Sequence, residues 1–92
     1  MEYFAKVRGF INPKTMKPVP NQYIIETMDG IYFQSYTSTI VYKPLNGKIK
    51  LDFKFWDYSK TTSKYRNKFL NETKEETEAK IKSGEYELVI LN

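Results

Sequence analysis

Apolar and polar residues alternate along six stretches of the chain, and a period of two is typical of half-buried β-strands. The predicted strands cover residues 2–9, 22–28, 31–36, 37–45, 48–56 and 85–91. A segment with three prolines and no periodicity, residues 12–20, separates the first two and predicts an exposed loop. Most of the sheet is therefore expected from the first half of the chain.

The dipeptide Asp29-Gly30 predicts a tight turn between the second and third strands, because these residue types accept the positive φ angles of a type I′ turn. In the register that this turn implies, Met28 lies opposite Ile31. One face of the hairpin then consists of Ile24, Met28, Ile31 and Phe33. We expect this apolar face to pack in the core.

The dipeptide Asn46-Gly47 predicts a second hairpin, in which Leu45 lies opposite Lys48. One face then holds Ile40, Tyr42, Ile49, Leu51, Phe53 and Phe55, with Phe53 mostly buried, and the other holds Val41, Lys43, Lys48, Lys50, Asp52 and Lys54. This register puts two lysines, at positions 43 and 50, directly opposite each other. Such a pair destabilises a sheet unless the side chains diverge into water or hold an anion. The lysine face is thus either a solvated edge or a site for an anionic partner.

Beyond residue 58 the period lengthens to about 3.6, which predicts two short helices. Thr62 or Ser63 is a suitable N-cap for the first helix. The second begins at Thr73, where Glu76 completes a capping box, and it ends at Gly84.

The order of five strands, two helices and one strand predicts a single α+β domain over residues 1–92. We expect a mostly antiparallel sheet of five to six strands with two short helices packed on one face. The 40% apolar content suits one core without disulfide bonds. The final strand offers an edge for pairing between chains, so both a monomer and a homodimer are open.

The chain has no Cys and no His, which excludes thiol nucleophiles, imidazole bases and Cys/His zinc sites. Asp29 with Asp52-Phe53-Lys54 has the residue types of a metal-dependent nuclease, but Asp29 is already explained as a turn residue. We therefore expect no enzyme, no cofactor and no metal site. No apolar run suits a membrane span or a signal peptide, so a cytoplasmic location in a bacterial host cell is expected.

Positive charge is concentrated in residues 43–68, which hold eight Lys and Arg against two Asp. Lysines interleaved with aromatic residues can hold phosphates and stack bases. The candidate partner-binding residues are Lys43, Lys48, Lys50, Lys54, Trp56, Tyr58, Lys60, Lys64, Tyr65, Arg66 and Lys68. Core packing is the competing interpretation for the aromatic residues, of which Tyr58 and Tyr65 are expected to reach solvent.

The runs WDYSKTTSKYRNKFLNETKEETEAKIKSGEYELVILN and NPKTMKPVPNQYIIETMDGIYFQSY resemble small proteins of phages and mobile elements of Gram-positive bacteria. The resemblance implies a genomic setting in which small stand-alone domains often act as inhibitors of host defence, anti-CRISPR proteins among them. In that setting we expect a binding protein that acts on a host defence protein or ribonucleoprotein complex. Many inhibitors that imitate DNA are strongly acidic, whereas this chain has a basic centre. Binding to a complex that carries nucleic acid, or to an acidic protein surface, is therefore favoured over imitation of DNA. The alternative is a small nucleic-acid-binding accessory protein that uses the same surface.

Overall fold

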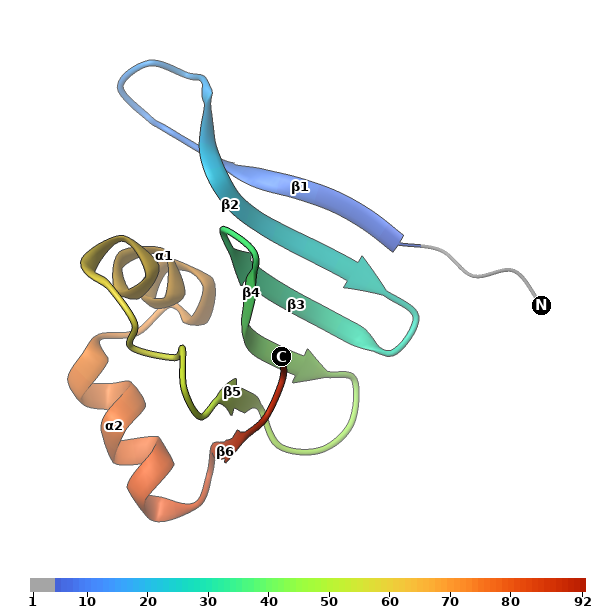
Figure 1. The fold of residues 1–92 in the computed structure, drawn as a ribbon, viewed down its shortest axis with the longest axis vertical. Helices are drawn as coiled ribbons and strands as arrows, with labels where there is room; N and C mark the ends of the chain where they lie inside the picture. Colours follow the sequence, from blue (N-terminus) through green and yellow to red (C-terminus); the bar gives the residue numbers. More distant parts are fainter. Residues whose placement is uncertain (1–4) are drawn as a thin grey trace.

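A six-stranded sheet and two helices form the fold in the computed structural model, which describes residues 5–92 (Figure 1). The elements are β1 (Ala5–Ile11), β2 (Pro18–Thr27), β3 (Gly30–Ser35), β4 (Ser38–Pro44), β5 (Lys50–Asp52), α1 (Lys60–Leu70), α2 (Lys74–Ser83) and β6 (Glu87–Val89). The strands are ordered in the sheet as they are in the chain. Four pairs are antiparallel, and β5 and β6 are parallel. The predicted α+β fold is confirmed, although residues 2–4 of the first predicted strand lie outside the described residues.

The turn between β2 and β3 differs from the predicted one by its position. Glu26 pairs with Ile31, so Met28 and Asp29 form the turn and Gly30 begins β3. A side chain on Gly30 would collide with the backbone of the neighbouring strand β4, which explains why glycine occupies the strand position. Ile24, Ile31 and Phe33 share one face of the hairpin, as predicted. Met28 lies in the turn and does not belong to that face.

The predicted register of the second hairpin is wrong by one residue. Val41 pairs with Leu51, so Lys50 lies opposite Tyr42 instead of Lys43. The connection between β4 and β5 spans residues 45–49, longer than the two-residue turn that the dipeptide predicted. A one-residue change of register moves every side chain of a strand to the other face of the sheet.

A β-bulge in β4 explains why both Ile40 and Val41 are buried. Phe33 pairs with Val41, but the next residue of β3 pairs with Thr39, which leaves Ile40 as an extra residue. Alternation cannot predict two consecutive core residues, since it assigns them to opposite faces.

Strand β5 ends early because the Asp52 carboxylate accepts hydrogen bonds from the backbone amides of Lys54 and Phe55, at 3.0 and 2.8 Å. These bonds turn the chain away from the sheet. Phe53 is consequently 68% exposed, and its predicted burial is wrong.

The core lies between the sheet and α1. Its buried apolar residues are Phe33, Ile40, Val41, Leu51, Tyr65 and Tyr86. The helix contributes Tyr65 and Phe69, whose rings lie 5.1 Å from Phe10 and 5.7 Å from Phe33, respectively. Ile81 packs against the same cluster from α2.

The helix boundaries follow local capping chemistry. The second helix begins with the predicted capping box and ends at Gly84 in a left-handed conformation, as expected. The first helix begins earlier than predicted, because Ser59 is its N-cap and accepts from the amide of Thr62 at 3.1 Å. No helix in residues 5–92 is long and apolar enough to span a membrane.

Candidate functional site

The exposed lysines of α1 form one line along the helix. Lys60, Lys64 and Lys68 are four residues apart, which places them on the same side of an α-helix. The helix contains no Asp or Glu. With Lys14 of the β1–β2 loop we call these residues the lysine ridge, and none of the four forms an ion pair within the described part of the chain.

A small cavity of about 220 Å³ lies between the β1–β2 loop and α1, beside three lysines of the lysine ridge. It is lined by Asn12, Pro13, Lys14, Lys64, Tyr65 and Lys68. The ammonium groups of Lys64 and Lys68 lie 5.4 and 5.2 Å from the centre of the Tyr65 ring. Tyr65 itself is only 8% exposed, so its predicted exposure is wrong. Its ring makes cation–π contacts with both ammonium groups. Three lysines around one hollow produce a local positive potential.

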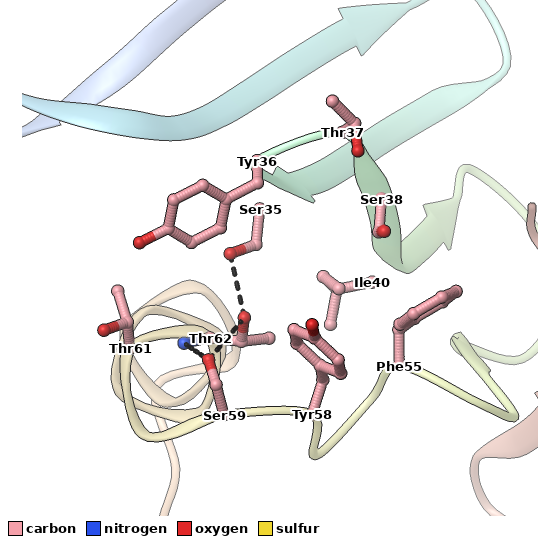
Figure 2. A pocket seen from close by; sticks show the side chains of 10 residues that line it. All are labelled: Ser35, Tyr36, Thr37, Ser38, Ile40, Phe55, Tyr58, Ser59, Thr61 and Thr62. Atoms are coloured by element: carbon pink, nitrogen blue, oxygen red, sulfur yellow. Dashed lines mark hydrogen bonds between the residues drawn. The ribbon is translucent and has the colours of Figure 1, made fainter.

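A larger hollow of about 590 Å³ lies at the N-terminal end of α1 (Figure 2). It is lined by Ser35, Tyr36, Thr37, Ser38, Ile40, Phe55, Tyr58, Ser59, Thr61 and Thr62. A hydrogen bond of 2.9 Å between the hydroxyls of Ser35 and Thr62 joins the end of β3 to the helix. We call this cavity the hydroxyl hollow. Tyr58 is 66% exposed, which confirms that this side chain reaches solvent.

Sequence reasoning missed the contribution of the β3–β4 turn to this hollow. Ser35 and Thr62 are far apart in the chain, and nothing local connects them. The available signal was the presence of two segments rich in hydroxyl groups, SYTST at 35–39 and SKTTS at 59–63. Helix capping already explains the second segment, since Ser59 caps α1, so its composition alone does not indicate a cavity.

Arg66 is not a surface group, and Trp56 is half-buried against the core. Arg66 is 0% exposed, donates to the carbonyl of Trp56 at 2.6 Å and pairs with Asp57 at 3.3 Å. Burial opposes ionisation of this carboxylate, but the hydrogen bonds that it accepts from Lys74, Ser63 and Arg66 hold its pKa below the usual value. The assignment of Arg66 to a partner-binding surface is therefore corrected: it joins the segment after β5 to α1, and Lys74 of α2 pairs with the same Asp57 at 2.8 Å.

The remaining predicted lysines do not form one face. Lys50 pairs with Glu87 of β6 at 3.7 Å. Lys43, near the end of β4, and Lys48, in the β4–β5 connection, are both exposed. That connection lies on the opposite side of the molecule from α1 in the view of Figure 1. Lys54 lies over the ring of Phe55, at 5.5 Å from its centre. The continuous lysine-lined hairpin face is thus absent from the described sheet.

Asp52 has a structural role. The carboxylate is buried and accepts a third backbone hydrogen bond from Leu91 at 2.8 Å, in addition to those from the turn after β5. Burial opposes its ionisation, but these bonds hold the pKa of Asp52 below its usual value. Across residues 5–92, no three His, Cys, Asp or Glu side chains lie close enough to hold a metal ion.

Comparison with known proteins identifies a family without a described activity. Searches of curated proteins and of solved structures find no match. One family model, described as a family of unknown function (DUF8033), matches residues 9–86. This region includes α1, the hydroxyl hollow and most of the sheet. The chain therefore belongs to the family of unknown function DUF8033.

Proposed function

We propose that the protein is a non-enzymatic binding protein whose lysine ridge binds the phosphates of a nucleic acid, either free or carried by a larger complex. The observation that supports this most directly is the line of unpaired lysines on a helix without acidic residues. On α2, by contrast, two lysines are paired: Lys74 with Asp57 and Lys80 with Glu72, both at 2.8 Å. A row of cations without partners is what a polyanion requires.

The resemblance to phage and mobile-element proteins supports a more specific setting, inhibition of a host defence nuclease complex. In that setting the ridge would contact the nucleic acid held by the complex, or an acidic protein surface beside it. A pull-down from host lysate, with and without added nuclease, separates these partners. A protein partner survives the nuclease treatment, whereas a nucleic-acid bridge does not.

The proposal is tested by the salt dependence of binding to labelled oligonucleotides. Replacing Lys64 and Lys68 with Gln should weaken binding and reduce the slope of log K against log salt by roughly one for each lost phosphate contact. The matched control replaces Lys43 and Lys48 with Gln, which removes the same charge from the other side of the molecule. Equal effects of the two double variants, or no binding by the unmodified protein, would contradict the proposal.

A further inference from the structure

We propose that the hydroxyl hollow is a base-binding pocket, so that the lysine ridge binds single-stranded nucleic acid with one base inserted beside α1. This inference rests on the proposed function and adds the class of nucleic acid to it. The volume of about 590 Å³ lies within the range of roughly 300 to 1,000 Å³ that is usual for ligand pockets.

The apolar part of the hollow suits a flat ring. Ile40 and Phe55 contribute apolar surface, and the exposed rings of Tyr36 and Tyr58 stand on either side of the Ser35–Thr62 hydrogen bond in the view of Figure 2. An edge contact with Phe55, at 5.4 Å and 70°, orients the Tyr58 ring although most of that ring is exposed. Exposed, oriented aromatic rings are the groups on which unpaired bases stack.

The polar part of the hollow suits a neutral ligand that both donates and accepts hydrogen bonds. Among residues 5–92, no charged side chain lines it. Three of its hydroxyls, on Ser35, Ser59 and Thr62, are bonded to one another. Those of Thr37, Ser38 and Thr61 have no hydrogen-bond partner within residues 5–92 and can act as donors or acceptors toward the edge of a base.

The hollow and the lysine ridge adjoin each other on one helix. Thr61 lines the hollow, and Lys64 is three residues further along α1, so the two side chains are neighbours on the helix surface. A base in the hollow would therefore have its phosphate next to the ridge. A carbohydrate could also stack on the tyrosines, but a neutral sugar would make no use of the adjoining cations. A base paired in a duplex would first have to leave its stack, which disfavours duplex DNA.

The test compares three labelled ligands of equal length by fluorescence anisotropy: a single strand, a duplex and a single strand with abasic sites. Tyr58→Ala and Thr61→Val should weaken binding of the normal single strand, by about tenfold for the tyrosine, and leave binding of the abasic strand unchanged. Phe53→Ala is the matched control, because this ring is equally exposed and lies outside the hollow. Its binding should equal that of the unmodified protein.

Different outcomes contradict the two proposals. Suppose that Tyr58→Ala and Thr61→Val bind the single strand normally, while the variant with Gln at positions 64 and 68 binds it more weakly. The base pocket is then refuted, and the phosphate-binding lysine ridge stands. Equal affinity of the unmodified protein for the normal and the abasic strand would also refute the pocket. If the unmodified protein binds none of the three ligands, the proposed function fails together with the inference. A native-like melting curve for each variant excludes unfolding as the cause.

Discussion

Arg66 stacks on Trp56, with the guanidinium carbon 5.0 Å from the ring centre, and also donates a hydrogen bond to the carbonyl oxygen of the same residue. From the sequence, both residues are candidates for binding a nucleic acid, because one is cationic and the other aromatic. In the fold they contact each other instead. The arginine satisfies a backbone carbonyl that follows the short strand β5, and the tryptophan covers the charge. The pair therefore fixes the path of the chain between the sheet and α1.

Removing this arginine should destabilise the fold. Arg66→Ala leaves the Trp56 carbonyl and part of the Asp57 carboxylate without a partner, and we expect a loss of about 3 kcal/mol in the free energy of unfolding. Urea denaturation followed by tryptophan fluorescence measures it. Lys64→Ala, on the exposed side of the same helix, should change stability by no more than about 0.5 kcal/mol. A stable Arg66→Ala variant with weakened partner binding would restore its assignment to the surface.

Two phenylalanines should respond to truncation in opposite ways. Phe33 is fully buried beneath α1, so Phe33→Ala should lower the free energy of unfolding by about 3 to 5 kcal/mol. Phe53→Ala should stay within about 0.5 kcal/mol of the unmodified protein, because most of that ring is already in water. Thermal or urea unfolding distinguishes the two. A large loss for Phe53→Ala would mean that β5 continues beyond Asp52 with its side chains in the core.

Acid should weaken the fold through Glu72. Burial opposes ionisation of this carboxylate, but hydrogen bonds from Lys80, Thr77 and Tyr86 hold its pKa below the usual value. The unfolded chain therefore takes up the proton first as the pH falls. The stabilisation is fully present above the ordinary pKa of Glu, about 4.3, and is lost as the pH falls further.

Glu72→Gln should lower stability at neutral pH and make the dependence of unfolding free energy on pH shallower below about pH 4.3. Urea titrations at a series of pH values measure this. Glu75→Gln, in the exposed first turn of α2, removes the same charge and serves as the control. Identical pH profiles for the two variants would show that the network around Glu72 does not contribute to acid sensitivity.

Local patterns predicted the elements of this fold, whereas tertiary contacts determined their exact pairing. The capping box at Thr73 depends on four adjacent residues, so the sequence reveals it directly. The bulge at Ile40 and the register of β5 against β4 depend on contacts between strands, which the alternation within a single strand does not reveal.

The candidate site was predictable in part for the same reason. The spacing of Lys60, Lys64 and Lys68 is visible once a helix is assumed, and the helix places them in one line. The burial of Arg66 depends on partners that precede α1, and the hydroxyl hollow requires the β3–β4 turn to meet that helix. Composition alone therefore does not distinguish the exposed lysines of α1 from the buried Arg66.

The strand order has a consequence for the order of folding. The first four pairings join strands that follow each other closely in the chain, so these contacts have a small sequence separation. The parallel pairing of Leu51 with Leu88 must instead close a loop that contains both helices. Closing a long loop costs more conformational entropy, so we expect the strands β1 to β5 to associate first and β6 to dock last. Because α1 lies inside that loop, the lysine ridge and the hydroxyl hollow reach their final geometry only when folding is complete.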